Sequence, residues 1–507
     1  MVFSLEVNRA VVPSVDARIA STYGPHRTRG AGTVRRVQAL AFCNPLLRLK
    51  RLAAAISRRG RAIAFLLGFV GTFGVMTGPA AAQGIMLLRD TETERALRSY
   101  EDPLLKAGGL EPAAVKLYLV NDPSVNAFVA EGQNMFIFSG IILFAHNANE
   151  LKGVMAHETG HMVAGHLSRS TEAMHKAMIP MLLSMIVGIA AIAAGAGEAG
   201  AMILLGGQGI AQAQFNAFSR VQEATADQIA IKLLNKTHQS SRGLLATFTR
   251  LADDEARATV NPDAYASDHP MGRDRVANLE TEVEASPYKD VPEDPAVEHE
   301  YEMLQAKLFG YVAPLKEVFD HFPVSDKSKP ARYARAMAYS RSPDLPKALA
   351  EINSLIKDEP NNPYFYEVLG QIYVSMAKPE LGVAAYQHCV DLMSDAPQLR
   401  VALAAAQLAT ERPGLAKPAL DNLKIALQQE DDDSFAWYEA AQAYSQLNNE
   451  PMAQLATAER FYSVGAMAQA AQFASRARHG LEQGSPDWQR ANDIVAIAVP
   501  AARQQQQ

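Results

Sequence analysis

Two histidines and a glutamate stand close together in the first third of the sequence, as His157, Glu158 and His161. Apolar residues around them recur at helical rather than alternating spacing. On a helix, His157 and His161 lie one turn apart on one face, where two imidazoles can bind one Zn²⁺ ion. Glu158 is turned by about 100° from His157, so it flanks the metal and can take a proton from water. This spacing predicts a peptidase site with one Zn²⁺ ion and Glu158 as general base, the alternative being a buried helix with incidental histidines.

A third protein ligand is required, because a catalytic zinc ion has three protein ligands and one open position. Glu223 and Asp227 are four residues apart and share one face of a predicted helix. We expect Glu223 to be the third ligand and Asp227 to accept the free ring N–H of a ligand histidine. On its own the pair would also fit a solvated acidic face. His166 follows His161 by five residues, which places it off the ligand face, so we do not expect it to bind the metal.

The elements that must position these residues begin near residue 83. Residues 83–118 are predicted to be one helical region, with charged pairs between apolar residues as on a surface helix. Strands are predicted at 117–120, 126–130 and 135–138, forming a small antiparallel sheet just before the zinc helix. Two roles for this sheet are open: it closes the core beneath the helix, or it offers an edge to an extended peptide.

An apolar insert separates the zinc helix from Glu223. Between Ala177 and Ser219 the only charged residue is Glu198, and the part from 177 to 197 is long enough to span a bilayer. That part is rich in Ala, Gly and Met, so its hydrophobicity is moderate. Three interpretations are open: a membrane-spanning segment, a helical insert that contacts a membrane surface near the cleft, and a buried helical hairpin.

The first 82 residues differ in charge from the rest of the chain. They contain 12 Lys+Arg against Glu6 and Asp16, although the 507-residue chain has a formal net charge of -6. The uncharged run 62–76 and the small residues Ala80 to Ala82 complete the order of a secretory signal peptide. We therefore expect export to a bacterial periplasm. The acidic remainder excludes a nucleic-acid binder, which needs a basic face.

A repeat region is predicted from about Ala331, where the sequence becomes Ala-rich and helical with a period near 34. Tyr366, Gly370 and Tyr373 have the spacing of a tetratricopeptide (TPR) first helix, and the same spacing recurs 71 residues later from Trp437. Helical pairs of this kind stack into a solenoid whose concave face can recruit proteins. An ordinary Ala-rich helical bundle is the alternative.

The motifs that carry chemistry stand in a defined order: Asn126-Ala127-Phe128, Gly153 to His161, Ser219-Arg220, Glu223, Asp227, Ser267, His269-Pro270 and Arg275-Val276. This order resembles the membrane-associated gluzincin peptidases of the HtpX and CAAX-prenyl-protease type. The predicted signal peptide and TPR repeats point, within that family, to the BepA-like periplasmic zinc metalloproteases. The repeat region departs from that pattern in containing only Cys389, so it cannot form the disulfide found in such repeats.

The resemblance implies the same three zinc ligands and the same general base. It also implies that His269 occupies the fourth zinc position in a self-inhibited resting state, and that Arg275 has a structural role near the zinc helices. The edge strand at Asn126, Ala127 and Phe128 would hold the substrate. Misfolded or stalled envelope proteins would be the substrates, and the outer-membrane assembly machinery would be a partner of the repeats.

The predicted fold is α+β and mostly α, with a gluzincin-type zinc peptidase domain and small β-sheet followed by an all-α TPR-like solenoid. The predicted function is an exported zinc-dependent endopeptidase. A periplasmic chaperone or assembly scaffold with a latent protease domain and an integral-membrane protease are the alternatives. The chain is divided into a leader with signal peptide (1–82), a peptidase domain (83–286) with the apolar insert (177–219), a linker with connecting helices (287–330), TPR-like repeats (331–498) and a disordered tail (499–507).

Overall fold

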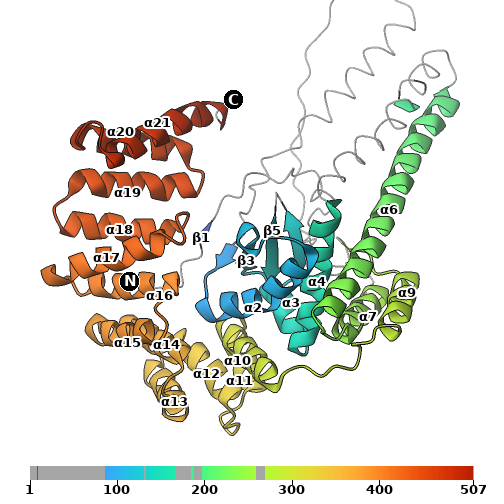
Figure 1. Ribbon diagram of the computed structural model, residues 1–507, viewed down its shortest axis with the longest axis horizontal. Coiled ribbons are helices and arrows are strands. Elements are labelled where there is room, and N and C mark those ends of the chain that lie inside the picture. The colour runs from blue at the N-terminus through green and yellow to red at the C-terminus, as the bar shows by residue number, and fades with distance from the viewer. Residues whose placement is uncertain are drawn as a thin grey trace, which may run out of the picture. The chain divides into compact units, whose positions relative to one another are not determined.

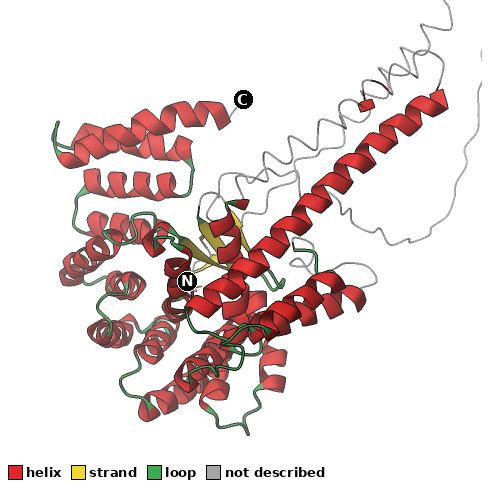
Figure 2. Cartoon of the chain, turned by 45° about the vertical axis from the view of Figure 1, so that its right-hand side comes forward, coloured by secondary structure: helices red, strands yellow, loops and turns green. Residues whose placement is uncertain are grey.

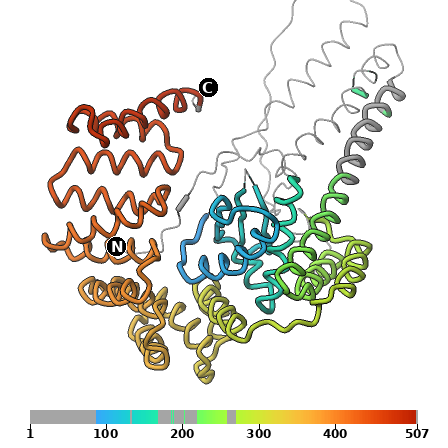
Figure 3. The backbone as a smooth tube through the Cα atoms, in the orientation of Figure 1, coloured from blue at the N-terminus to red at the C-terminus, as the bar shows by residue number. Residues whose placement is uncertain are grey.

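The computed structural model describes residues 86–130, 133–166, 197–257 and 269–505, together with 8–9, 184, 185 and 187 (Figure 3). Helices dominate these residues and surround one small sheet (Figure 2), which confirms the predicted fold class. The predicted signal peptide and most of the apolar stretch from 177 to 196 lie outside the described residues. Among the helices that are described, none has both the length and the apolar character needed to cross a bilayer.

The sheet contains a parallel pair of strands, so the prediction of an antiparallel sheet is wrong. Strands β3 and β5 are parallel, whereas the remaining neighbours are antiparallel. The central residues of β5 are all buried, and this strand takes an interior position, while the half-buried β4 lies at the edge. The order is β1-β2-β3-β5-β4, with bounds β1 (Asn8–Arg9), β2 (Met86–Leu88), β3 (Lys116–Val120), β4 (Ala127–Ala130) and β5 (Asn134–Phe138).

The region from 83 to 118 is not one helix, because its first described residues pair with β3. Leu87 and Leu88 belong to β2 and lie opposite Val120 and Leu119. Asp90 then caps helix α2 (Thr91–Gly108) by accepting a hydrogen bond from the Thr93 backbone N–H at 2.9 Å. The helix ends before β3, which accounts for the rest of the difference.

The helix that carries the two histidines is buried from Ala148 to His161, except at the half-buried Asn149, and only its last turn reaches the surface. It contacts α2, α6, α7 and strand β4 (Figure 1). Its apolar residues join a core cluster that also includes Leu97, Ile137, Leu233 and Phe248. Helices that are buried all round are typical of the centre of a domain. The helices of this part are α3 (Ser139–Phe144), α4 (Ala148–Ala164), α6 (Gly197–Lys236), α7 (Arg242–Arg257) and α9 (Arg273–Glu284).

Helical pairs follow from residue 329 onwards, as the repeat pattern predicts. Helices α12, α14 and α16 begin at residues 329, 363 and 397, which reproduces the period of about 34. Gly370 packs on the ring of Tyr386, where an added Cβ would lie 2.8 Å from the ring carbons. Successive helices contact one another in a stack, orange to red in Figure 1.

The bounds of these C-terminal helices are α10 (Pro295–Val312), α11 (Leu315–His321), α12 (Lys329–Ser340), α13 (Leu345–Asp358), α14 (Pro363–Ser375), α15 (Pro379–Leu392), α16 (Pro397–Ala409), α17 (Ala416–Leu427), α18 (Ser434–Gln446), α19 (Glu450–Ser463), α20 (Met467–Gly480) and α21 (Pro486–Gln505). The predicted disordered tail is wrong for residues 499–505, which continue α21. Ile494 and Ala498 are buried and Val499 packs against the same cluster, so the helix continues past 498 because its apolar face still has a partner.

A buried ion network joins the start of α2 to the repeat helices. The Lys307 ammonium lies 2.5 Å from Asp90, 3.2 Å from Glu92 and 3.4 Å from Glu367. The Tyr333 hydroxyl donates a hydrogen bond to Glu92 at 2.7 Å. Lys307 therefore pairs with the capping residue of α2 and with carboxylates of two separate helices. Buried charges of this kind are costly to leave unpaired.

Candidate metal centre

Helix α4 sets the positions of His157, Glu158 and His161. The helix begins where the Asn147 side chain accepts a hydrogen bond from the Glu150 N–H at 2.9 Å. Both His157 and Glu158 are fully buried. The Nε2 atoms of His157 and His161 lie 3.0 Å apart, as expected for imidazoles one helical turn apart that point toward a shared centre.

Glycines on α4 allow two other helices to approach it closely. A Cβ added at Gly160 would lie 2.6 Å from the Ala226 carbonyl oxygen of α6. A Cβ added at Gly153 would lie 2.6 Å from the Leu244 Cα atom of α7. Both distances are shorter than real Cβ atoms tolerate, so only glycine fits. The contact at Gly160 brings Glu223, one turn before Ala226, to the two histidines.

Glu223 completes a set of donor atoms suited to zinc. Its Oε2 atom lies 3.4 Å from His157 Nε2, and its Oε1 atom lies 3.5 Å from His161 Nε2. Ligand atoms at about 2.0–2.1 Å from one ion in tetrahedral geometry are roughly 3.3–3.4 Å apart. Two imidazole nitrogens and a carboxylate oxygen are also the ligand types that zinc prefers. The buried group therefore fits the predicted ion.

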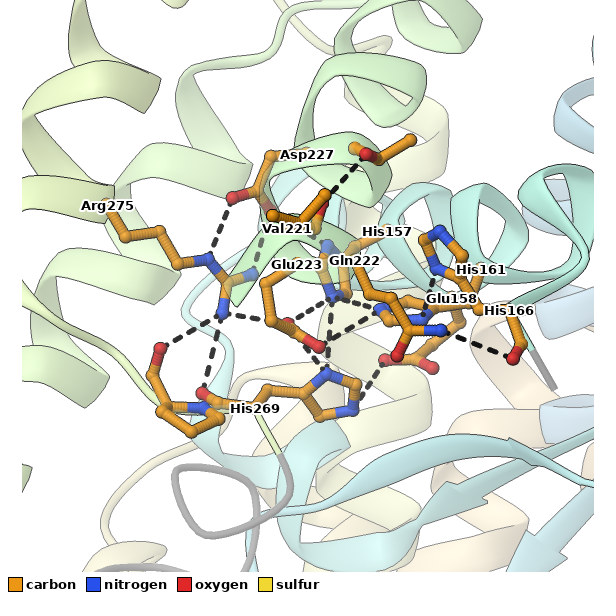
Figure 4. A network of polar contacts seen from close by, with 12 residues as sticks. His157, Glu158, His161, His166, Val221, Gln222, Glu223, Asp227, His269 and Arg275 are labelled. Atoms are coloured by element: carbon orange, nitrogen blue, oxygen red, sulfur yellow. Dashed lines mark hydrogen bonds and ion pairs between the residues drawn. The ribbon is translucent and has the colours of Figure 1, made fainter. Parts of the chain in front are cut away.

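His269 lies in the same group, between Glu223 and the predicted general base (Figure 4). Its Nδ1 atom is 3.0 Å from Glu223 Oε2 and 3.4 Å from His157 Nε2. Its Nε2 atom is 3.6 Å from Glu158 Oε1. One ligand atom from each of His157, His161, Glu223 and His269 can be chosen so that all lie within 4.8 Å of one another. The four residues could together hold one metal ion.

Asp227 and Arg275 support these residues from behind. Asp227 Oδ1 lies 2.9 Å from His157 Nδ1, the ring nitrogen that faces away from the cluster. Arg275 binds both Asp227 oxygens at 2.8 Å, and its Nη1 atom lies 2.9 Å from Glu223 Oε2. The guanidinium also stacks on the Phe248 ring, 4.9 Å from the centroid, and that ring meets His157 edge-on. Such contacts orient a ligand imidazole and fix its tautomer.

The charges in the cluster determine where a proton sits when no metal is bound. Burial acts to lower the pKa of His157, but hydrogen bonds to Asp227 and Glu223 outweigh it and raise the pKa to about 9. Burial and the charge of His157 lower the pKa of His161. Burial acts to raise the pKa of Asp227, yet hydrogen bonding to Arg275 holds it below its usual range. A metal that binds here displaces a proton from His157, so metal affinity increases with pH below about 9.

His166, which the sequence places off the ligand face, is buried beside a predicted ligand. Its side chain is buried and its Nδ1 atom lies 3.1 Å from His161 Nδ1. Because that contact uses the nitrogen of His161 opposite to the cluster, His166 can orient the His161 ring. His166 is not one of the four residues whose donor atoms converge on the candidate metal position.

Sequence reasoning missed the residues that make the site compact. Gly153 and Gly160 are seven residues apart and interior to a helix, where each glycine costs about 1 kcal/mol relative to alanine. That spacing, two turns along one face, could have signalled close helix packing. No signal in the sequence pointed to Phe248, which comes from α7, or to Glu101 on α2, which contacts Thr159 of the zinc helix.

Replacing Gly160 by alanine tests the helix contact. The new Cβ would meet the Ala226 carbonyl, so α4 and α6 must separate and Glu223 must move away from the histidines. We expect a loss of about 1–3 kcal/mol in stability and roughly tenfold or greater weakening of zinc affinity. Competition with a chromophoric chelator measures the affinity.

Gly272→Ala is the control for this experiment, because a Cβ at Gly272 meets no atom within 4 Å. Zinc affinity of Gly160→Ala equal to that of the control would contradict the proposed importance of the contact.

Comparison with known proteins agrees with this geometry. Residues 91–283 match peptidase family M48, which uses zinc. A putative beta-barrel assembly-enhancing protease of Vibrio cholerae is 28% identical over 264 residues, which cover 50% of this chain and 53% of that protein. The beta-barrel assembly-enhancing protease of Escherichia coli is 24% identical over 375 residues, or 73% of this chain and 75% of that protein. The mitochondrial metalloendopeptidase OMA1 of Saccharomyces cerevisiae is 30% identical over 192 residues, or 36% of this chain and 50% of that protein. Residues 91–283 are therefore similar to peptidase family M48, and the chain is similar in sequence to the beta-barrel assembly-enhancing proteases.

Proposed function

We propose that the chain is an exported zinc-dependent endopeptidase that hydrolyses misfolded or stalled envelope proteins. One observation carries the proposal. Donor atoms of His157, His161 and Glu223 converge in a buried site, and Glu158 stands beside them on the same helix as two of the ligands. The match to peptidase family M48 and to relatives named as metalloendopeptidases supports it.

In this proposal His157, His161 and Glu223 hold the zinc ion, with His157 oriented by Asp227. When bound, zinc polarises the scissile carbonyl and makes a nearby water more acidic. Glu158 accepts the water proton and later donates it to the leaving amine. Arg275 has a structural role, because it neutralises part of the charge that Glu223 and Asp227 bring into the buried site.

Strand β4 is the proposed binding edge for the substrate. In the described sheet it comes last in the strand order and pairs with β5 alone. It also contacts α4, which carries two of the three predicted ligands and the predicted base. An extended peptide can add to such an edge through backbone hydrogen bonds. Ala127 and Phe128 would then lie along the bound peptide, and Asn126 directly precedes the strand.

The partners and the compartment are further parts of the proposal. The repeat helices would recruit protein substrates or the outer-membrane assembly machinery, which the names of the bacterial relatives support. The leader-like composition of residues 1–82 supports export to the periplasm. The apolar insert 177–219 would contact a membrane surface.

Replacing Glu158 by glutamine tests the chemistry. The amide cannot accept the water proton, so we expect kcat for an unfolded protein substrate to fall by roughly 10²–10⁴-fold while zinc content is retained. Glu280→Gln, at an exposed position on α9, is the matched control and should cleave normally. Cleavage by Glu158→Gln at the wild-type rate would contradict the assigned base, and would favour a scaffold role.

Replacing His269 by alanine tests the resting state. His269 lies within reach of both Glu223 and Glu158, so its ring would occupy the position that water and substrate need. We expect the variant to keep zinc through the other three ligands and to cleave unfolded protein several-fold faster. The exposed His299→Ala variant should match the wild type. A slower His269→Ala enzyme with full zinc content would show that His269 assists the reaction instead.

A further inference from the structure

A fully buried carboxyl group lies next to the zinc helix and has no part in the proposed mechanism. Glu101 is 0% exposed and belongs to α2, which packs against α4. Its Oε1 atom makes a very short contact with the Thr159 hydroxyl, directly after Glu158 in the chain. Its Oε2 atom is buried and, within the part of the chain that the structure describes, has no hydrogen-bond partner. An ionised carboxylate in this position would be costly, because one of its oxygens would carry charge without a donor.

The protons available at this contact can be counted. The Thr159 hydroxyl also lies 2.8 Å from the Met155 carbonyl oxygen, which can only accept. A threonine hydroxyl has a single proton, so it cannot donate to both Met155 and Glu101 at once. If Thr159 donates to Met155, as a helical threonine commonly does, the proton between Thr159 and Glu101 must come from Glu101.

We propose that Glu101 is held as a neutral carboxylic acid that donates to Thr159 and so positions the turn of α4 that carries Glu158. The chain of hydrogen bonds then runs from Glu101 through Thr159 to Met155, and every hydrogen is used. Glu101 is a positioning residue, because it acts on the proposed base through its neighbour. The inference rests on the proposed function for its catalytic consequence, but not for the protonation itself.

The charges around Glu101 agree with this protonation. Arg98 and Asp102 face it from its own helix, and Glu158 faces it from α4. Burial is the main cause that raises the pKa of Glu101 to about 8. A neutral Glu101 also adds no further negative charge near Glu158.

Protonation predicts a specific dependence of stability on pH. A carboxyl whose pKa is about 8 in the folded protein, against an ordinary value of 4.5, stabilises the protein fully below pH 4.5. This contribution decreases as the pH rises and is lost once the pH passes the folded pKa. Glu101→Gln cannot ionise, and its amide can still donate to Thr159, so the variant should not show this loss.

The experiment is thermal unfolding of the full-length, zinc-loaded chain between pH 5 and pH 9. The difference in unfolding midpoint between Glu101→Gln and the wild type should widen in favour of the variant up to about pH 8 and then level off. Glu111→Gln, at an exposed position just after α2, is the control and should run parallel to the wild type. A parallel profile for Glu101→Gln, or its failure to fold, would overturn the inference.

A second readout tests the positioning role. Glu101→Ala should lower kcat with little change in KM or zinc content, and Glu101→Gln should restore it. Equal kcat values for Glu101→Ala and the wild type would overturn that role. Absence of peptidase activity in every variant would instead contradict the proposed function, while the unfolding profiles would still decide whether Glu101 is protonated.

Discussion

The close contact between α4 and α6 is the constraint on which the site depends. Gly160 lets the Ala226 carbonyl oxygen lie where a side chain would otherwise stand. Only at this separation can a glutamate carboxylate on α6 reach imidazoles on α4, since Glu223 places both its oxygens within 3.5 Å of them. Without this contact between α4 and α6, the helical spacing of His157 and His161 would supply two ligands but not the third. Packing of two helices thus decides whether three separated residues act as one ligand set.

The convergence of these residues concentrates charge in the protein interior. Neighbouring residues compensate this charge either by ion pairing or by protonation. Arg275 binds Asp227 through two hydrogen bonds and contacts Glu223, so two carboxylates share one guanidinium. Asp227 contacts Nδ1 of His157, the ring nitrogen that faces away from the other ligands. Glu101, which has no cation of its own at hydrogen-bond distance in the described structure, is the carboxyl for which we infer neutrality instead. The buried carboxyl groups around the zinc helix therefore differ in protonation because their neighbours differ.

Local spacing allowed the sequence to predict much of the site's composition but little of its assembly. The i,i+4 relation of His157 with His161, and of Glu223 with Asp227, follows from helix geometry alone. The strand order did not follow, because pairing of β3 with β5 depends on which strand is buried on both faces. Phe248 and Glu101 were missed for a similar reason: they reach the zinc helix from other helices, and no periodicity records such contacts. Helix α21 extends beyond residue 498, where a disordered tail was predicted to begin, because Val499 packs against an apolar cluster.

In the proposed metal centre, a carboxylate from α6 joins two imidazoles of α4 on one metal ion. Zinc content of the purified chain and of a Glu223→Ala variant, measured side by side by elemental mass spectrometry, tests it most directly. We expect about one zinc ion per wild-type chain and a large loss in the variant, since Glu223 is the carboxylate that completes the ligand set with the two imidazoles of α4. Full zinc content in Glu223→Ala would contradict the assigned ligand set.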